Sequence, residues 1–249
     1  MITPTWKVKT MKMKEASPIV IDLEKLNQVR SLRLSTGSHL KPRDGEIKEA
    51  CFMECVSYVS GELWSDRPKC VCPVVGVFLR NWNDGLRDTS TRTHLLMPLI
   101  ARVIGSKSTK EIEVQRSYLA LDWLVREQIP AWLGLAGLND RADALRSLPA
   151  IVDGVTAGAA NPLLVSAGVT PGGAKSDAAS AARDAAWDAA WTAASYTASD
   201  TVSDTVNGAE WYSAWHDASD TVSDAARDET VIQLQASALR LVERMVELL

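Results

Sequence analysis

Residues 108–127 have the sequence STKEIEVQRSYLALDWLVRE, and this stretch decides the fold class. Ser108 and Glu111 have the spacing of a capping box, in which the two side chains satisfy backbone N–H groups at the start of a helix. The sequence therefore predicts a long helix that begins here and continues to about Glu127. With the further helices predicted on both sides of it, the protein is expected to be all-α, that is, mainly helical.

The N-terminal part of the chain predicts two helices and at most one short strand. After Asp22, apolar residues recur every three positions, which is typical of an amphipathic helix. Asp44 suits a helix N-cap and Gly61 suits a helix end, so a second helix is expected over residues 46–60. Residues 5–14 alternate apolar residues with lysines, and this period of two predicts a short strand whose lysines protect an exposed edge.

Helices are also predicted on either side of residues 108–127. Pro73 suits the first position of a helix that stops near Gly85. Another is expected over residues 91–104, with a kink near Pro98, because proline has no backbone N–H to donate. Shorter helices are expected over residues 130–136, 141–148 and 150–156.

The composition indicates a folded protein of the cytoplasm. Of its 249 residues 46% are hydrophobic, which is enough to bury a core. The longest nearly uninterrupted apolar stretch, residues 71–79, is much shorter than a membrane span, and no apolar run follows the basic N-terminus as in an export signal. Four cysteines without such a signal indicate reduced thiols. We therefore expect a location in the cytoplasm of a bacterial host and no membrane partner.

Charge and composition separate the C-terminal third from the rest. Residues 177–249 have four Lys or Arg and thirteen Asp or Glu, which makes contact with nucleic acid unlikely for this region. Residues 157–176 contain Gly and two Pro without periodicity, so they are expected to form a linker. The predicted organisation is a helical head over 1–156, this linker, and an alanine-rich arm over 177–249.

The arm is built from twelve tetrads that begin at Ala181, such as AARD, AAWD and AAWT. Four residues of an α-helix turn through 400°, so successive tetrads shift by about 40° around the helix. One straight helix would wind the Trp and Asp rows around its axis, and the Asn207-Gly208 pair is a natural place for a break. We therefore expect a hairpin of two helices, over about 177–205 and 209–247, folded on each other or onto the head.

Glu54 is the most informative residue of the helix predicted over 46–60. Steps of 100° per residue place it on an apolar arc of that helix. The other members of the arc are Ala50, Cys51, Cys55 and Tyr58. A buried carboxylate without a partner is costly, so Glu54 is expected to be protonated or to pair with a base or a hydrogen-bond donor. The candidate partners are His39, Arg67 and the Tyr58 hydroxyl.

Cysteines near this helix leave three interpretations open. If Pro73 begins a helix, Cys72 lies at its N-cap, where backbone N–H groups stabilise a thiolate, and a nucleophilic site of Cys72, His39 and Glu54 is one hypothesis. A zinc site is the second. Its ligands would come from Cys51, Cys55, Cys70, Cys72 and His39. The third interpretation, which we prefer, is that the thiols are small core residues and Glu54 is structural. No phosphate-binding, dinucleotide-binding or hydrolase motif is present, and no cofactor is expected.

The sequence resembles a family of uncharacterised actinobacterial and actinobacteriophage proteins. The resemblance lies in GSH at 37–39, CFME at 51–54, GELWSDRPKCVCPV at 61–74, FLRNWND at 78–84, the AARD and AAWD repeats, and LQASAL at 234–239. It implies a helical, cysteine-containing head followed by an alanine-rich repeat tail. It also implies a phage or actinobacterial origin and a role in phage–host conflict, with no established activity.

Our leading hypothesis is a non-enzymatic helical protein-interaction protein. A protein partner is expected, and a homo-oligomer formed through residues 177–249 is a further possibility because a repeat surface can match a copy of itself. The alternative is an enzyme or a small-ligand binder that uses Cys72, Glu54 and His39 in a pocket of the head.

Overall fold

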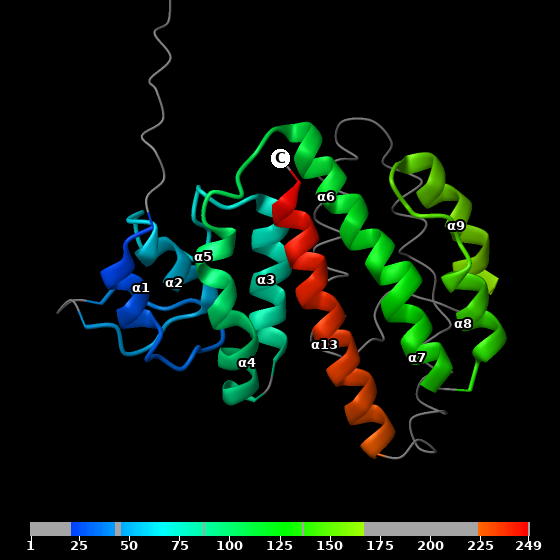
Figure 1. Ribbon diagram of the computed structural model, residues 1–249, viewed down its shortest axis with the longest axis horizontal. Helices are drawn as coiled ribbons and strands as arrows, with labels where there is room; N and C mark the ends of the chain where they lie inside the picture. The colour runs from blue at the N-terminus through cyan, green and yellow to red at the C-terminus, as the bar shows by residue number, and fades with distance from the viewer. Residues whose placement is uncertain (1–20, 43–45, 87, 136, 167–223, 249) are drawn as a thin grey trace, which may run out of the picture.

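The stretch that predicts the long helix forms most of the longest helical rod of the head (Figure 1). The computed structural model describes residues 21–42, 46–86, 88–135, 137–166 and 224–248. Within these ranges all regular secondary structure is helical, so the predicted all-α class is confirmed. The strand expected over 5–14 lies outside the described residues. No helix of the described part combines the length and apolar character that crossing a membrane requires.

The rod consists of α6 (Lys110–Trp123), a π-helical turn η2 (Leu124–Gln128) and α7 (Ile129–Leu135). Its N-cap is Thr109, whose hydroxyl accepts from the backbone N–H of Ile112 at 3.4 Å, so the predicted start at Ser108 is displaced by one residue. The helix also continues beyond the predicted end. Pro130 has no backbone N–H to donate, so it would disrupt a regular α-helix. The π turn immediately before it changes the pattern of backbone hydrogen bonds, and the rod continues past the proline.

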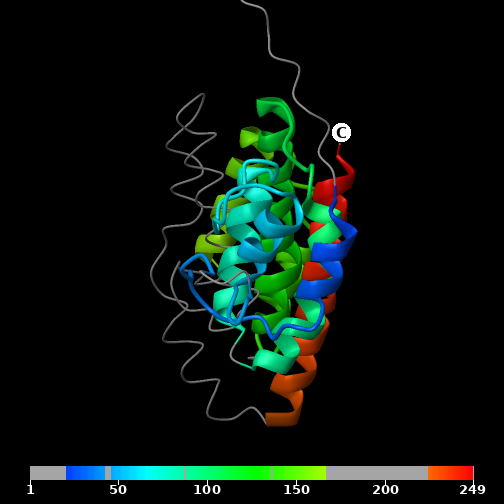
Figure 2. The same ribbon diagram turned by 90° about the vertical axis from the view of Figure 1, so that its left-hand side faces the viewer.

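The C-terminal helix α13 (Asp224–Glu247) lies along this rod, as Figures 1 and 2 both show. It contributes a buried stripe to the main core, formed by Leu234, Ala238, Leu241, Val242 and Met245. Helix α13 corresponds to the C-terminal part of the second predicted helix, over 209–247. It packs onto the head, which is one of the two arrangements expected for the arm. The remaining part of the predicted hairpin, from 177 to 223, lies outside the described residues.

The rest of the main core comes from Trp123 and Trp132 of the rod and from the N-terminal helices and their loops. These helices are α1 (Leu23–Val29), α2 (Phe52–Val59), α3 (Pro73–Gly85), α4 (Thr89–Leu96), the 3-10 turn η1 (Met97–Leu99) and α5 (Ile100–Val103). Pro73 occupies the first turn of α3 as predicted, and the kink expected near Pro98 is the 3-10 turn that separates α4 from α5. A T-shaped ring pair of Phe78 with Trp123 joins α3 to α6, and Phe78 makes a second T-shaped pair with Trp82 within α3.

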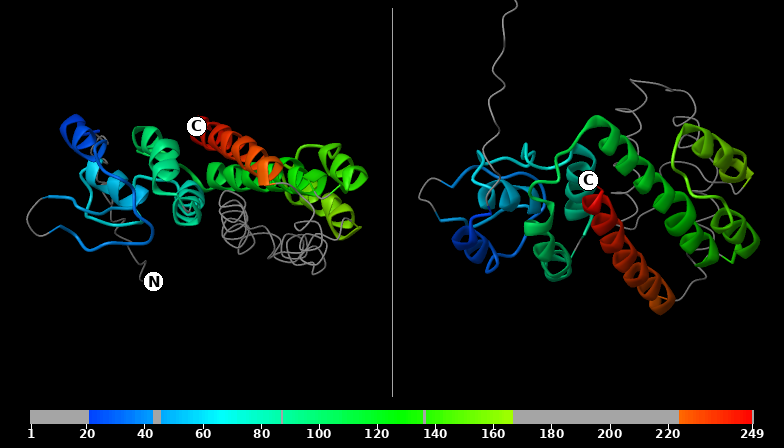
Figure 3. Two further views of the ribbon diagram at one scale, coloured as in Figure 1. Left: turned by 90° about the horizontal axis from the view of Figure 1, so that it is seen from below. Right: turned by 45° about the horizontal axis from the view of Figure 1, so that its top comes forward.

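A second, smaller core lies under α8 (Asn139–Arg146) and α9 (Gly154–Ser166). Figure 3 shows these helices at the opposite end of the head from α1 and α2. The prediction of a linker is wrong for residues 157–166, which are helical because Asp153 caps the helix, accepting from Thr156 N at 2.8 Å, and because Ala157 and Ala160 are buried. The helix predicted over 150–156 is also displaced, since α9 begins only at Gly154.

Candidate functional site

Glu54 sets the start of α2. Its Oε2 atom accepts a hydrogen bond from the backbone N–H of Cys51 at 2.8 Å, and Cys51 is the N-cap. Residues 46–50 are therefore not helical, and the predicted start at residue 46 is wrong because this local cap begins the helix at Phe52. Asp44, the cap predicted from sequence, lies outside the described residues. The predicted end at Gly61 is confirmed, with φ at 74°.

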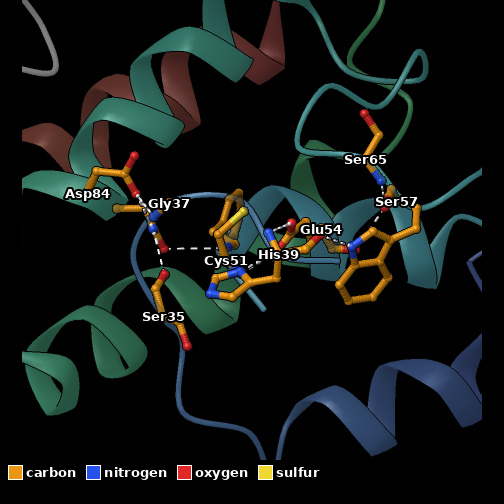
Figure 4. Close-up of polar contacts among 11 residues, drawn as sticks. Ser35, Gly37, His39, Cys51, Glu54, Ser57, Ser65 and Asp84 are labelled. Carbon is orange, nitrogen blue, oxygen red and sulfur yellow. Dashed lines mark hydrogen bonds and ion pairs between the residues drawn. The ribbon is translucent and has the colours of Figure 1, made fainter. Parts of the chain in front are cut away.

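The same carboxylate binds His39 from the preceding loop, as Figure 4 shows. Oε1 accepts from the backbone N–H of His39 at 2.5 Å, and Nδ1 of the imidazole lies 2.8 Å from Oε2. Glu54 is 1% exposed, and its carboxyl oxygens are bound by two backbone N–H groups and the His39 ring nitrogen instead of water. Of the three partners predicted for it, the structure places His39 there. The Tyr58 hydroxyl instead donates to Gln28 at 2.6 Å, and Arg67 donates its backbone N–H to Ser65 at 3.0 Å.

A second loop, after α2, is fastened to the first one. The indole Nε1 of Trp64 donates to the carbonyl of His39 at 2.9 Å. Ser57 Oγ accepts from the backbone N–H of Ser65 at 3.1 Å and donates to the carbonyl of Glu54 at 2.9 Å (Figure 4). The His39 loop, the start of α2 and the loop at Trp64 therefore form one hydrogen-bonded unit.

Asn83 attaches this unit to α3. Its side-chain amide donates to the carbonyl of Ser35 at 2.9 Å, and its oxygen accepts from the backbone N–H of Phe52 at 3.2 Å. Asp84 accepts from the backbone N–H of Gly37 at 2.8 Å. Next to these contacts is an open pocket of about 250 Å³, whose polar lining includes Asp66, Arg80 and Asn81. The sequence predicted only a helix stop at residues 83–85 and gave no signal for the role of Asn83.

Burial keeps three of the four cysteines protonated. It raises the pKa of Cys51 to about 12, and it is also the main cause of the raised pKa values of Cys55 and Cys70. The neighbouring Glu54 charge adds to the effect at Cys51 and Cys55. A protonated thiol is a poor nucleophile and a poor metal ligand.

Among the described residues, Glu54 and His39 bond to each other, and neither bonds to the predicted nucleophile Cys72. It is the N-cap of α3 as predicted, but it is fully buried, and its backbone N–H donates to Ser106 at 3.1 Å. The thiol beside the Glu54–His39 pair is that of Cys51. The five residues proposed as zinc ligands do not form a cluster of three or more that could hold a metal ion, and the described ranges contain no such group elsewhere.

Arg92 is a buried residue of this region that sequence reasoning missed. It is 3% exposed, and its guanidinium donates to the carbonyls of Asn83 at 2.8 Å, Leu34 at 2.9 Å and Leu86. It thereby joins α4 to the loop that follows α1 and to the C-terminal end of α3. An arginine within an otherwise polar helix gives no sequence signal that distinguishes such a role from solvent exposure.

Comparison with protein-family models, with curated proteins and with solved structures finds no match to this chain.

Proposed function

We propose that the protein is a non-enzymatic helical interaction protein that binds its partner through Leu40, Leu63 and Trp64. We call these three residues the Leu40–Leu63 surface. The observation that carries the proposal is the exposure of Leu40 at 89% and Leu63 at 86%, the highest values among large apolar side chains of the described residues. Apolar side chains exposed together on a rigid support are typical anchors of protein interfaces.

The support beneath this surface is the hydrogen-bonded unit at the start of α2. The Trp64 indole binds the backbone of His39, which brings the residues next to Leu40 and Leu63 together. Glu54 and Ser57 fix the same two loops to α2. Because the loops are already ordered, a partner would bind with little additional loss of conformational entropy.

The polar groups beneath the surface support a structural role better than a chemical one. The Glu54 carboxyl is bound by two backbone N–H groups and by the His39 ring nitrogen, and the adjacent thiol of Cys51 has a pKa raised to about 12 by burial. An enzyme of the Cys/His/Glu type needs a thiolate near neutral pH beside its base. These observations favour the interaction hypothesis over the enzymatic alternative.

The charges around the surface indicate the chemistry of the partner. Lys41, Arg67 and Lys69 are exposed, and no ion pair involves them within the described ranges. The nearby carboxylate of Glu62 accepts from the backbone N–H groups of Lys69 at 2.6 Å and of Cys70 at 2.7 Å. Glu62 and Asp66 are only half-exposed, so the fully exposed charged side chains of residues 39–42 and 62–69 are basic, and we propose that the partner is a protein segment that combines apolar and acidic side chains. With the family resemblance, we further propose a phage or actinobacterial origin and a role in phage–host conflict.

The test compares three forms of the full-length protein as baits in a host lysate. The first is the wild type, the second carries Leu40→Ser with Leu63→Ser, and the third carries Leu23→Ser. Leu23 is also exposed, at 69%, but lies on α1, so it controls for general loss of apolar surface. We expect proteins retained by the wild type and by Leu23→Ser to be lost from the double variant and to be released by salt. Identical retention by all three baits would refute the proposal.

A further inference from the structure

The pocket next to the Asn83 contacts is lined by charges of both signs. Asp66, from the loop after α2, and Arg80 and Asp84, from α3, all border it. Asp66 and Arg80 are half-buried, so water screens their charges less than it would on a flat surface. The volume of about 250 Å³ is that of about eight water molecules, which suits a small molecule.

Both carboxylates of the pocket keep oxygen atoms available to a ligand. Asp84 accepts through Oδ1 from the backbone N–H of Gly37 and from the side-chain amide of Asn83, both at 2.8 Å, and these two bonds fix its orientation. Its Oδ2 atom forms no bond within the part of the chain that the structure describes. The carboxylate of Asp66 likewise forms neither a hydrogen bond nor an ion pair among the described residues.

Arg80 supplies the opposite charge. Its Nη1 atom donates to the backbone carbonyl of Asp66 at 3.4 Å, which places the guanidinium at the wall of the pocket. A guanidinium has five N–H donors, so it can bind the carboxylate of a ligand in addition to its contacts within the protein. Across the described ranges, no ion pair joins Arg80 to Asp66 or to Asp84. The charges that line the pocket therefore do not neutralise one another.

The buried part of the lining is uncharged. It consists of the side chains of Cys51 and Met53 at the start of α2, together with the Asn83 amide. Figure 4 shows Cys51 between the Gly37–Asp84 contact and the Glu54–His39 pair. Because burial raises the pKa of the Cys51 thiol to about 12, this thiol carries no charge at neutral pH. A small uncharged group of a ligand can pack against the two sulfur atoms.

We infer that this pocket binds a small α-amino acid with an uncharged side chain. Asp84 and Asp66 bind its ammonium group, and Arg80 binds its carboxylate. A simple anion such as phosphate would lie beside two carboxylates, and a polyamine would lie beside the guanidinium, so like charges oppose both. An apolar molecule would displace water from polar groups without replacing their hydrogen bonds. A zwitterion compensates the charges of both signs.

This inference is independent of the proposed function. The pocket is lined by neither Leu40 nor Leu63, so the variant Leu40→Ser with Leu63→Ser should bind the amino acid as the wild type does. Loss of partner proteins from that variant and loss of amino-acid binding are therefore separate results. Failure of either proposal would leave the other unaffected.

The first experiment titrates the full-length protein with single amino acids and measures the heat of binding by calorimetry. The probes are glycine, L-alanine, L-serine, L-valine and L-methionine. Each probe that binds is compared with two analogues, one without the amino group and one without the carboxyl group, which for L-alanine are propionate and ethylamine.

At least one probe should bind saturably, at one site per chain. Both of its analogues should bind at least about tenfold more weakly, because each leaves a charge of the pocket uncompensated. The absence of saturable binding for all five probes would overturn the inference, as would equal binding of an analogue that carries only one charge.

The second experiment repeats the titration with aspartate variants. Asp66→Asn removes a charge but no side-chain bond, and Asp84→Asn keeps an oxygen that accepts from Gly37, so both variants should retain the circular dichroism spectrum of the wild type. Each should bind the amino acid at least about tenfold more weakly. The matched control is Asp140→Asn, the same change at an exposed position of α8, at the opposite end of the head from α2. Unchanged binding by Asp66→Asn or Asp84→Asn, or an equal loss in Asp140→Asn, would overturn the inference.

Discussion

Glu54 and Arg116 are both 1% exposed, and each is surrounded by backbone groups of the opposite polarity. Glu54 accepts from the backbone N–H groups of His39 and Cys51 and from the His39 ring. Arg116, on α6, donates to the carbonyls of Met245 at 2.6 Å, Leu248 at 2.7 Å and Ser106. The first charge organises loops close to it in the chain, whereas the second holds the end of α13 against α6.

The two regions differ in the sequence distance that their bonds span. The partners of Glu54 are 3 and 15 residues away, and the α13 partners of Arg116 are 129 and 132 residues away. Loss of Glu54 is therefore expected to loosen one end of the head, while loss of Arg116 is expected to detach the element that closes the main core. The three predictions below test this difference, beginning with the largest expected effect.

Replacing Arg116 with alanine should have the largest effect. Three carbonyl groups would lose their donor in a buried site, at a cost of about 3–5 kcal/mol in the free energy of unfolding. Arg102→Ala is the matched control, because Arg102 also contacts α13, through Glu243 at 2.6 Å, but its side chain is 57% exposed. That exposed pair should contribute less than about 1 kcal/mol. Urea unfolding of both variants measures the two changes in the free energy of unfolding. Equal decreases would show that Arg116 does not hold α13 in place.

Replacing Glu54 should have an intermediate effect. Glu54→Ala removes the acceptor for three N–H groups and is expected to cost about 1–3 kcal/mol, while Glu54→Gln should cost less because it keeps the volume and one acceptor oxygen. Glu49→Ala, at an exposed position before α2, is the control and should be close to neutral. Thermal unfolding followed by circular dichroism provides the comparison. A midpoint unchanged by Glu54→Ala would contradict the burial of this carboxylate.

Glu113 should give the smallest effect, and one that depends on pH. Burial raises the pKa of this carboxyl, but hydrogen bonds from Lys107 and Lys110 outweigh it, and the net pKa lies below the usual 4.5. A lowered folded-state pKa contributes stability above the unfolded value, and this contribution is lost as the pH falls below about 4.5.

The test compares Glu113→Gln with the wild type at pH 7 and at pH 3.5. The variant should be less stable than the wild type at pH 7, by less than about 1 kcal/mol, because the two lysines are largely exposed. At the lower pH the two proteins should become similar. A difference that stays constant between the two pH values would mean that the ion pairs do not stabilise the folded state.

Several elements could be predicted because their signals act within one or two helical turns. Pro73 begins α3, Pro98 separates α4 from α5, and Gly61 and Gly105 adopt the positive φ values of 74° and 84° that end a helix. The candidate site was predicted in part for the same reason. Glu54 was expected to be buried and paired, and the structure adds that it is the third residue of α2 and that its partner is His39.

Other features depended on packing between distant segments, which a local pattern does not encode. The composition of residues 157–166 suits a linker, and they are helical because Ala157 and Ala160 fit against the smaller core. By itself the sequence determined the helical class, several helix ends and the burial of Glu54, because caps, prolines and apolar periodicity act over a few residues. Only the tertiary structure decided that α13 closes the core through Arg116, because those bonds join residues more than a hundred positions apart.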